Sequence, residues 1–163
     1  MPSVANDSDL EELVRKLGEL ESGDALEELA GNIAEEAIEL VKQGFEDERD
    51  PYGVSWAALE SRDGETLRDT RALYNSLHVV EATSTQVTIA DGVWYGIVHQ
   101  TGKTIRPRRA KALRFMVRGK PVFAQVVTIP ARPFFPREGD IPSGWQTAFE
   151  EVADEWFKSH FGR

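Results

Sequence analysis

The side chains best suited to acid–base or metal chemistry at neutral pH are three histidines, His78, His99 and His160. Nucleophilic catalysis would need a serine or threonine beside one of them, with an acid to orient the imidazole. None lies in a nucleophile-elbow pattern, and no close histidine pair has metal-ligand spacing. The absence of cysteine excludes thiolate metal sites and cysteine nucleophiles. The sequence therefore predicts no cofactor, no metal and no enzymatic activity.

His99 has the most distinctive surroundings of the three. We favour a histidine that ends a strand and hydrogen-bonds a neighbouring loop; an enzymatic alternative would place a site around His99 and Asp91. Nearby, Gly92, Gly96 and Gly102 lie within and just beyond the expected strand. They do not form the strand-to-helix turn that cradles phosphates, so nucleotide binding is not expected.

Charge is strongly segregated along this chain of 163 residues with net charge -9. Residues 1–50 carry 16 acidic and 4 basic side chains, whereas residues 101–137 carry 10 basic side chains and no acid. Basic side chains can bind nucleic-acid phosphates without sequence specificity, or dock on acidic helices of an adjacent subunit. We favour the subunit contact, because the same chain supplies an acidic surface and has no evident base-stacking array. The candidates for the subunit interface or for facing DNA are Arg106, Arg108, Arg109, Lys111, Arg114, Arg118, Lys120 and Arg132.

Helical periodicity marks both ends of the chain. Residues 1–23 are expected to form a short, partly mobile helical segment, and residues 24–163 a single α+β domain. A long amphipathic helix is predicted from Asp24 to Phe45. A short helix is expected over residues 67–77, and a final helix begins at Ser143, where Gln146 completes a capping-box pattern.

Alternating segments between these helices predict about five antiparallel strands. One hairpin is expected over residues 77–90, a single strand over 93–98, and a second hairpin over 112–129. Prolines make residues 130–136 a rigid, extended connection. The predicted fold class is α+β, with the sheet packed on the long N-terminal helix, a C-terminal helix and an extended basic hairpin. No apolar run is long enough for a membrane span, and the N-terminus lacks signal-peptide features, so synthesis in the cytoplasm is expected.

Three segments, read in order, resemble the virion-morphogenesis or tail-completion family of tailed phages, the group that includes the G protein of Mu-like phages. They are residues 45–59, with DPYG and WAAL; residues 67–77, LRDTRALYNSL; and YGIVHQTG at 95–102 followed by IPARPFF at 129–135. The resemblance spans about residues 24–160. Arg71 stands at a usual glycine and Gly96 at a usual alanine; we expect Arg71 to make the 67–77 helix more regular and Gly96 to weaken its strand.

The resemblance implies a structural protein of a tailed bacteriophage that acts in tail completion or head–tail joining. It implies a homo-oligomeric ring in the neck or connector of the virion, at the head–tail junction or tail end, with phage neck and tail proteins as partners. Contact with phage DNA in the channel is compatible with such a ring, and membranes are not expected partners. Residues expected to shape the fold are Trp56, Leu59, His99, Gln100, Gly102, Pro130, Pro133 and Phe134. The alternative function is sequence-nonspecific DNA binding through the basic hairpin 103–120.

Trp56 and Leu59 are expected to pin the loop after the long helix, while His99 and Gln100 bridge strand and loop through polar contacts. Arg132, held between two prolines, is expected to present a fixed guanidinium to a neighbour or to a carboxylate of its own fold.

Overall fold

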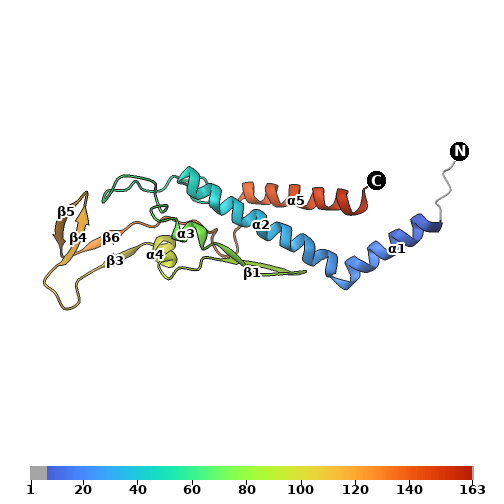
Figure 1. Ribbon diagram of the computed structural model, residues 1–163, viewed down its shortest axis with the longest axis horizontal. Coiled ribbons are helices and arrows are strands. Elements are labelled where there is room, and N and C mark those ends of the chain that lie inside the picture. Colours follow the sequence, from blue (N-terminus) through green and yellow to red (C-terminus); the bar gives the residue numbers. More distant parts are fainter. Residues whose placement is uncertain (1–6, 163) are drawn as a thin grey trace. The chain divides into compact units, whose positions relative to one another are not determined.

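The computed structural model describes residues 7–162 of the chain (Figure 1). Its helices are α1 (Asp7–Ser22), α2 (Asp24–Asp47), α3 (Ala72–Asn75), α4 (Gly96–Thr101) and α5 (Ser143–Phe161). Its strands are β1 (His78–Thr83), β2 (Gln86–Ala90), β3 (Lys103–Ile105), β4 (Leu113–Val117), β5 (Lys120–Ala124) and β6 (Val127–Ile129). The α+β class, the long N-terminal helix and the C-terminal helix are confirmed.

The chain forms two compact units, each built from separate stretches of sequence. Among the described residues, unit 1 contains 7–38, 79–89 and 143–162, and unit 2 contains 39–78 and 90–142. Helix α2 and the β1–β2 hairpin contribute residues to both units.

Unit 1 is mainly helical. Helix α2 begins at Asp24, as predicted, and its buried positions are small: Ala25, Ala30, Ala34 and Ala37. Helix α5 begins at Ser143, as predicted, and buries Trp145 and Trp156. Helix α1 contacts α5 and runs through Gly18 without a break.

In unit 2, helix α2 ends in a defined cap. Glu48 adopts a left-handed conformation with φ of 53°, and the Arg49 amide donates to Gly44 O at 2.9 Å, as in a Schellman motif. Asp50 Oδ1 then accepts hydrogen bonds from the amides of Tyr52 (2.9 Å) and Val54 (2.8 Å). These bonds form the turn predicted from the DPYG sequence.

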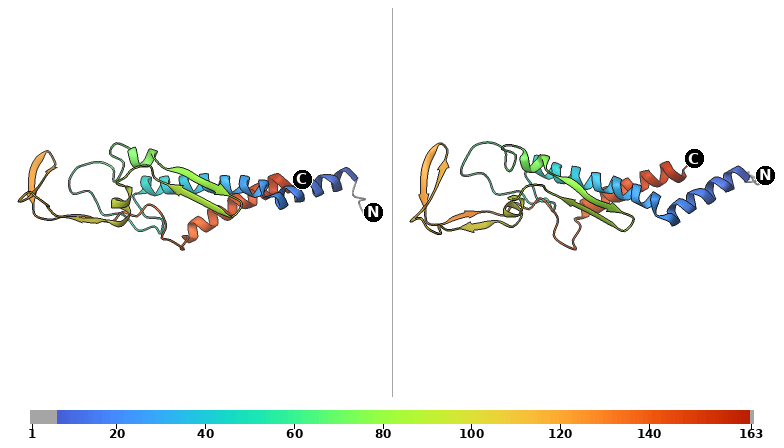
Figure 2. Two further views of the ribbon diagram at one scale, coloured as in Figure 1. Left: turned by 90° about the horizontal axis from the view of Figure 1, so that it is seen from below. Right: turned by 60° about the horizontal axis from the view of Figure 1, so that its bottom comes forward.

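The strands form three separate two-stranded sheets in the described residues, rather than one sheet of about five strands. The hairpins β1–β2 and β4–β5 are confirmed, and β3 pairs with β6, a pairing that was not predicted. In β4–β5, Val117 pairs with Lys120, and both turn residues between them, Arg118 and Gly119, have positive φ. Two such residues are typical of a type I′ turn. Figure 2 shows the β3–β6 ribbon leading into the β4–β5 hairpin, drawn in orange.

The predicted strand at 93–98 is wrong, because helix α4 begins at Gly96 inside it. Asp91 Oδ1 accepts a hydrogen bond from the Val93 amide at 3.2 Å and turns the chain. The Asp91 carboxyl group then lies against the Gly96 backbone, where a Cβ would stand 2.6 Å from the carboxyl carbon. Gly96 therefore permits a close approach and does not weaken a strand.

The helix predicted over residues 67–77 is reduced to the single turn α3. Two left-handed residues, Leu67 with φ of 61° and Arg71 with φ of 57°, prevent a longer helix. Arg71 occupies the usual glycine of the resembling motif, and its positive φ explains why glycine suits this position. The expectation that Arg71 makes the helix more regular is wrong.

Candidate functional site

The three segments that carry the family resemblance meet in the interior of unit 2, around Phe45. This ring is fully buried and contacts Trp56 edge-on, with ring centroids 5.4 Å apart. It also lies 5.9 Å from the Tyr74 ring and 5.4 Å from the Phe134 ring. Leu73 from α3 is 2% exposed in the same unit. The end of α2, the loop after it, α3 and the proline-rich segment thus each place an apolar side chain in unit 2's interior.

Gln100 on α4 binds the proline-rich segment through both ends of its amide. Its Oε1 accepts hydrogen bonds from the amides of Phe134 (2.9 Å) and Phe135 (3.1 Å). Its Nε2 donates to Phe135 O at 2.9 Å. One side chain therefore satisfies three backbone groups of a segment that has no strand partner of its own.

Trp56 and Arg132 connect the loop after α2 to the same proline-rich segment. Trp56 Nε1 donates to Pro133 O at 2.8 Å. In the opposite direction, Arg132 Nε donates to Ala57 O at 2.9 Å and Nη2 donates to Ala58 O at 3.2 Å. We call the group formed by Phe45, Trp56, Gln100, Arg132 and Phe134 the motif clamp.

Arg132 forms hydrogen bonds within its own chain. The residue is 6% exposed, and its hydrogen-bond acceptors in the described residues are backbone carbonyls, not a carboxylate. Burial lowers the pKa of Arg132, and the nearby Glu48 carboxylate opposes that shift. Pro130, two residues before, and Pro133, directly after, restrict the backbone that presents this guanidinium.

His99 lies beside this segment and is partly buried. Its carbonyl accepts a hydrogen bond from the Arg132 amide at 2.7 Å, while its Nδ1 is buried without a hydrogen-bond partner. Burial lowers the pKa of His99, and the Arg132 charge lowers it further. Its ring packs edge-on against Tyr95, with centroids 5.9 Å apart. The imidazole is therefore a neutral packing group at neutral pH.

Gly102 follows α4 and allows two segments to touch. Its φ is 71°, and a Cβ there would lie 2.8 Å from the Ala131 amide nitrogen and 3.0 Å from Ile129 O. A larger residue would push the proline-rich segment away from α4. Of the other motif residues, Leu59 and Pro133 are partly buried and Pro130 is exposed.

Two polar residues, Glu48 and Tyr52, hold unit 2 together through contacts that the sequence did not predict. Glu48 Oε1 accepts a hydrogen bond from the Thr66 amide at 2.6 Å, which ties the end of α2 to a buried threonine. The Tyr52 hydroxyl donates to Asp140 O at 3.2 Å and accepts from the Arg137 amide at 2.9 Å. The DPYG turn indicated where Tyr52 lies but not what its hydroxyl binds.

The remaining basic candidates lie together on residues 106–120, which we call the basic segment. All seven are exposed: Arg106, Arg108, Arg109, Lys111, Arg114, Arg118 and Lys120. Within the described residues, only Arg118 has an acidic partner, Asp63 at 3.9 Å, and both side chains are exposed. At that distance and exposure the ion pair contributes little to folding stability.

The β4–β5 hairpin also exposes apolar side chains. Met116 is 55% exposed and Phe123 is 67% exposed, and Phe123 pairs across the hairpin with Arg114. The exposed face therefore combines basic and apolar groups, a composition typical of protein contact surfaces.

Within residues 7–162, no helix is long and apolar enough to cross a membrane. The same part of the chain contains no cluster of three or more histidine or carboxylate side chains able to hold a metal ion.

The model of the phage virion morphogenesis family matches residues 5–157. The chain belongs to this family. No curated protein and no solved structure matches it. Membership in the family gives the chain a structural or assembly role in phage particles and associates it with the virion. The motif clamp explains in physical terms why the recognised residues occur together.

Proposed function

We propose that this chain is a non-enzymatic subunit of a homo-oligomeric ring that completes the phage tail or joins the head to the tail. Its neighbours in the virion would be further copies of itself and phage neck and tail proteins, at the head–tail junction or tail end. It would be made in the host cytoplasm. The observation that carries the proposal is the basic segment, whose cations are exposed while the motif residues are used inside the fold.

The electrostatics of the chain support assembly. Unpaired charge on the surface of one protein attracts opposite charge on its partner. This attraction steers and orients their association. The chain itself supplies such a partner surface, because residues 1–50 carry 16 acids against 4 bases. Contacts between identical subunits could therefore bring the two charge patterns together and fix their register.

The surroundings of the histidines support a non-enzymatic role. His99 packs neutral beside the motif clamp. His160 stacks on Trp156 with ring centroids 4.7 Å apart, and the His78 ring bonds the carbonyl of Ser76 at 2.8 Å. Each imidazole thus packs against an aromatic ring or bonds a main-chain group.

The experiment that tests this function is negative-stain microscopy of lysates from a phage lacking the gene, with and without a complementing copy. We expect full heads with separate, unjoined or overlong tails, and normal particles when the copy is supplied. Intact infectious particles without the gene would overturn the proposal.

A second candidate, sequence-nonspecific DNA binding, is favoured by the seven exposed cations of the basic segment. If several of them neutralise phosphates, affinity for duplex DNA falls steeply between about 50 and 200 mM salt. A gel-shift titration measures this directly. Failure to retard DNA at the lower salt concentration would discard the candidate.

A further inference from the structure

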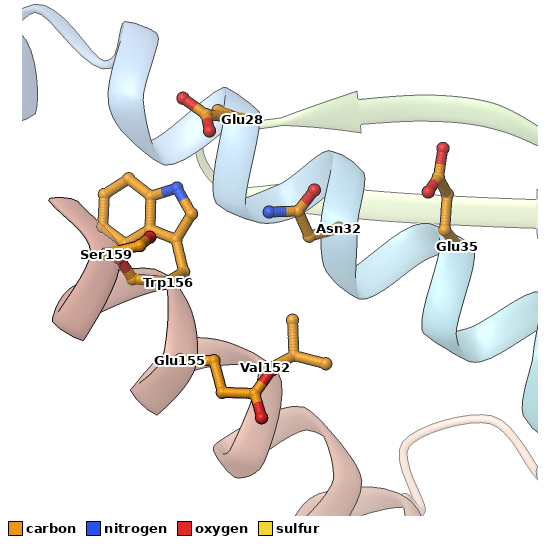
Figure 3. Close-up of a pocket in the computed structure, with 7 residues that line it drawn as sticks. All are labelled: Glu28, Asn32, Glu35, Val152, Glu155, Trp156 and Ser159. Atoms are coloured by element: carbon orange, nitrogen blue, oxygen red, sulfur yellow. Dashed lines mark hydrogen bonds between the residues drawn. The ribbon is translucent and has the colours of Figure 1, made fainter.

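Unit 1 contains an open groove between α2 and α5, which we call the acidic groove (Figure 3). Its volume is about 420 Å³. The lining residues are Glu28, Asn32 and Glu35 from α2, and Val152, Glu155, Trp156 and Ser159 from α5. The spacing of these residues follows one face of each helix, so the groove runs along the helices.

Three carboxylates give the acidic groove its charge. Glu28, Glu35 and Glu155 are all exposed, and none forms an ion pair within the described residues. Glu28 and Glu35 stand seven residues apart on α2, which corresponds to about 10.5 Å along the helix axis. A ligand with two cations at that separation would match both.

Trp156 adds a second, independent feature to the acidic groove. The residue is 4% exposed, and its Nε1 is buried with no hydrogen-bond partner. Figure 3 shows the indole between the helices, with its nitrogen edge toward α2. A buried donor without an acceptor is unfavourable. A carbonyl from an entering peptide would satisfy it after a small turn of the ring.

We propose that the acidic groove receives residues 106–111 of a second copy of this chain, a stretch we call the arginine loop. This deepens the ring role proposed above and rests on it. The sequence of the loop is RPRRAK, and its four cations are exposed with no acidic partner in the described residues. The occupant is therefore complementary in charge to the groove.

The spacing of the arginine loop fits the groove. Pro107 restricts itself and Arg106 to extended geometry, which favours polyproline II. In that geometry residues three apart share a face and lie about 9.3 Å apart. Arg106 and Arg109 would then face Glu28 and Glu35 with nearly matching separation. Residues 108–112 are bent in the isolated chain, so docking straightens them.

Trp156 and Asn32 would complete the recognition of the arginine loop. The indole and the amide side chain lie where a peptide backbone would pass between the two helices. Extended proline-containing peptides also bind grooves lined by aromatic residues. Here Trp156, which is 4% exposed, would act through its Nε1 donor and not through the face of its ring. Each copy carries one groove and one loop, so the contact is head-to-tail. Such a contact closes a ring when the rotation between subunits permits.

Reversing charge on each side of the contact tests the proposal. Glu28→Arg with Glu35→Arg reverses the groove, and Arg106→Glu with Arg109→Glu reverses the loop. Self-association, measured by analytical ultracentrifugation, should weaken at least about tenfold in either variant alone. An equimolar mixture should recover association, because each reversed surface then meets its opposite on the other variant.

Matched controls place the same charge changes elsewhere. Glu27→Arg with Glu151→Arg alters exposed residues of α2 and α5 that do not line the groove. Arg71→Glu with Lys103→Glu alters exposed cations outside the basic segment. Both controls should associate like the unmodified chain. Failure of the mixture to recover, or equal losses in the controls, would overturn the proposal.

A zero-length carbodiimide crosslink distinguishes contact between copies from contact within one chain. An equimolar mixture of unlabelled and heavy-isotope-labelled chains should join Lys111 to Glu28, Glu35 or Glu155 in mixed-isotope products. If these crosslinks joined only chains of the same isotope, or did not form at all, docking of the loop in the groove would be overturned. The gene-deletion phenotype would be unaffected by that result, so the two proposals fail separately.

Discussion

The motif clamp and the basic segment both belong to unit 2, yet they differ in how their polar groups are satisfied. In the clamp, Trp56, Gln100 and Arg132 each bond backbone groups of a facing segment. In the basic segment, six of the seven cations have no acidic partner within the described residues, and the seventh has a distant one. The polar side chains of the clamp are thus bonded within one chain, whereas most cations of the basic segment have no acidic partner among residues 7–162.

This difference separates what makes the protein fold from what makes it assemble. A buried polar group that loses its hydrogen-bond partner costs free energy, so loss of a clamp residue leaves backbone groups unsatisfied and lowers stability. Exposed charge contributes little to folding but can dominate association. We therefore expect substitutions in the clamp to destabilise the chain and substitutions in the basic segment to affect contacts with other molecules.

The largest expected effect on stability comes from Phe134→Ala. Phe134 is 2% exposed and contacts Phe45 and Phe135, with ring centroids 5.4 and 4.7 Å away. Removing a buried aromatic ring should lower the free energy of unfolding by about 3–5 kcal/mol. Chemical denaturation followed by tryptophan fluorescence measures the change. Phe123→Ala, at a position 67% exposed, is the control and should change stability by less than about 0.5 kcal/mol.

A smaller loss is expected from Gln100→Ala. The change leaves the amides of Phe134 and Phe135 without their acceptor and Phe135 O without its donor. Unsatisfied buried groups cost about 1–3 kcal/mol each, and partial entry of water should reduce the total to about 2–4 kcal/mol. Denaturation of Gln125→Ala, which alters an exposed glutamine, gives the baseline. Equal midpoints for the two variants would refute the clamp's dependence on Gln100.

Arg71→Gly should stabilise the protein, in contrast to most glycine substitutions. Arg71 has φ of 57° and is exposed, so glycine relieves backbone strain without removing packing. The expected gain is about 0.5–1 kcal/mol, read from the denaturation midpoint. Arg71→Ala retains a Cβ and should show no such gain. A gain of equal size in both variants would mean that the arginine side chain, not the backbone, is the cause.

The smallest stability effect is a pH dependence carried by His99. In the unfolded chain this imidazole gains a proton near its ordinary pKa of 6.5, whereas burial lowers its pKa in the folded chain. The unfolded state therefore binds more protons, and the free energy of unfolding falls as the pH drops below about 6.5. Denaturation at about pH 7.5 and 5.5 should show a smaller fall in His99→Gln than in the unmodified chain. An equal fall in both chains would remove the role of His99.

The sequence predicts regular elements well where periodicity is strong. The amphipathic pattern from Asp24 places α2, and the alternation around Gly119 places the β4–β5 hairpin. The prediction is wrong where a side chain redirects the backbone. The segment around Val98 has strand-forming residues, but Asp91 turns the chain before Gly96 and α4 forms instead.

The motif resemblance identifies the clamp residues but not their partners. Gln100 and Trp56 bind backbone amides and carbonyls, which every residue carries, so residue types cannot indicate which ones are contacted. Arg132 illustrates the same limit, because an arginine between two prolines suits an exposed contact as well as a buried one. Its acceptors on Ala57 and Ala58 follow from the fold.

The most direct test of this division between folding and assembly uses one variant in two assays. The chain with Arg106→Glu and Arg109→Glu is purified for denaturation and also supplied to a phage lacking the gene. We predict a free energy of unfolding within about 0.5 kcal/mol of the unmodified chain, together with unjoined or incomplete particles and loss of infectivity. Full infectivity, or a variant that no longer folds, would contradict the account.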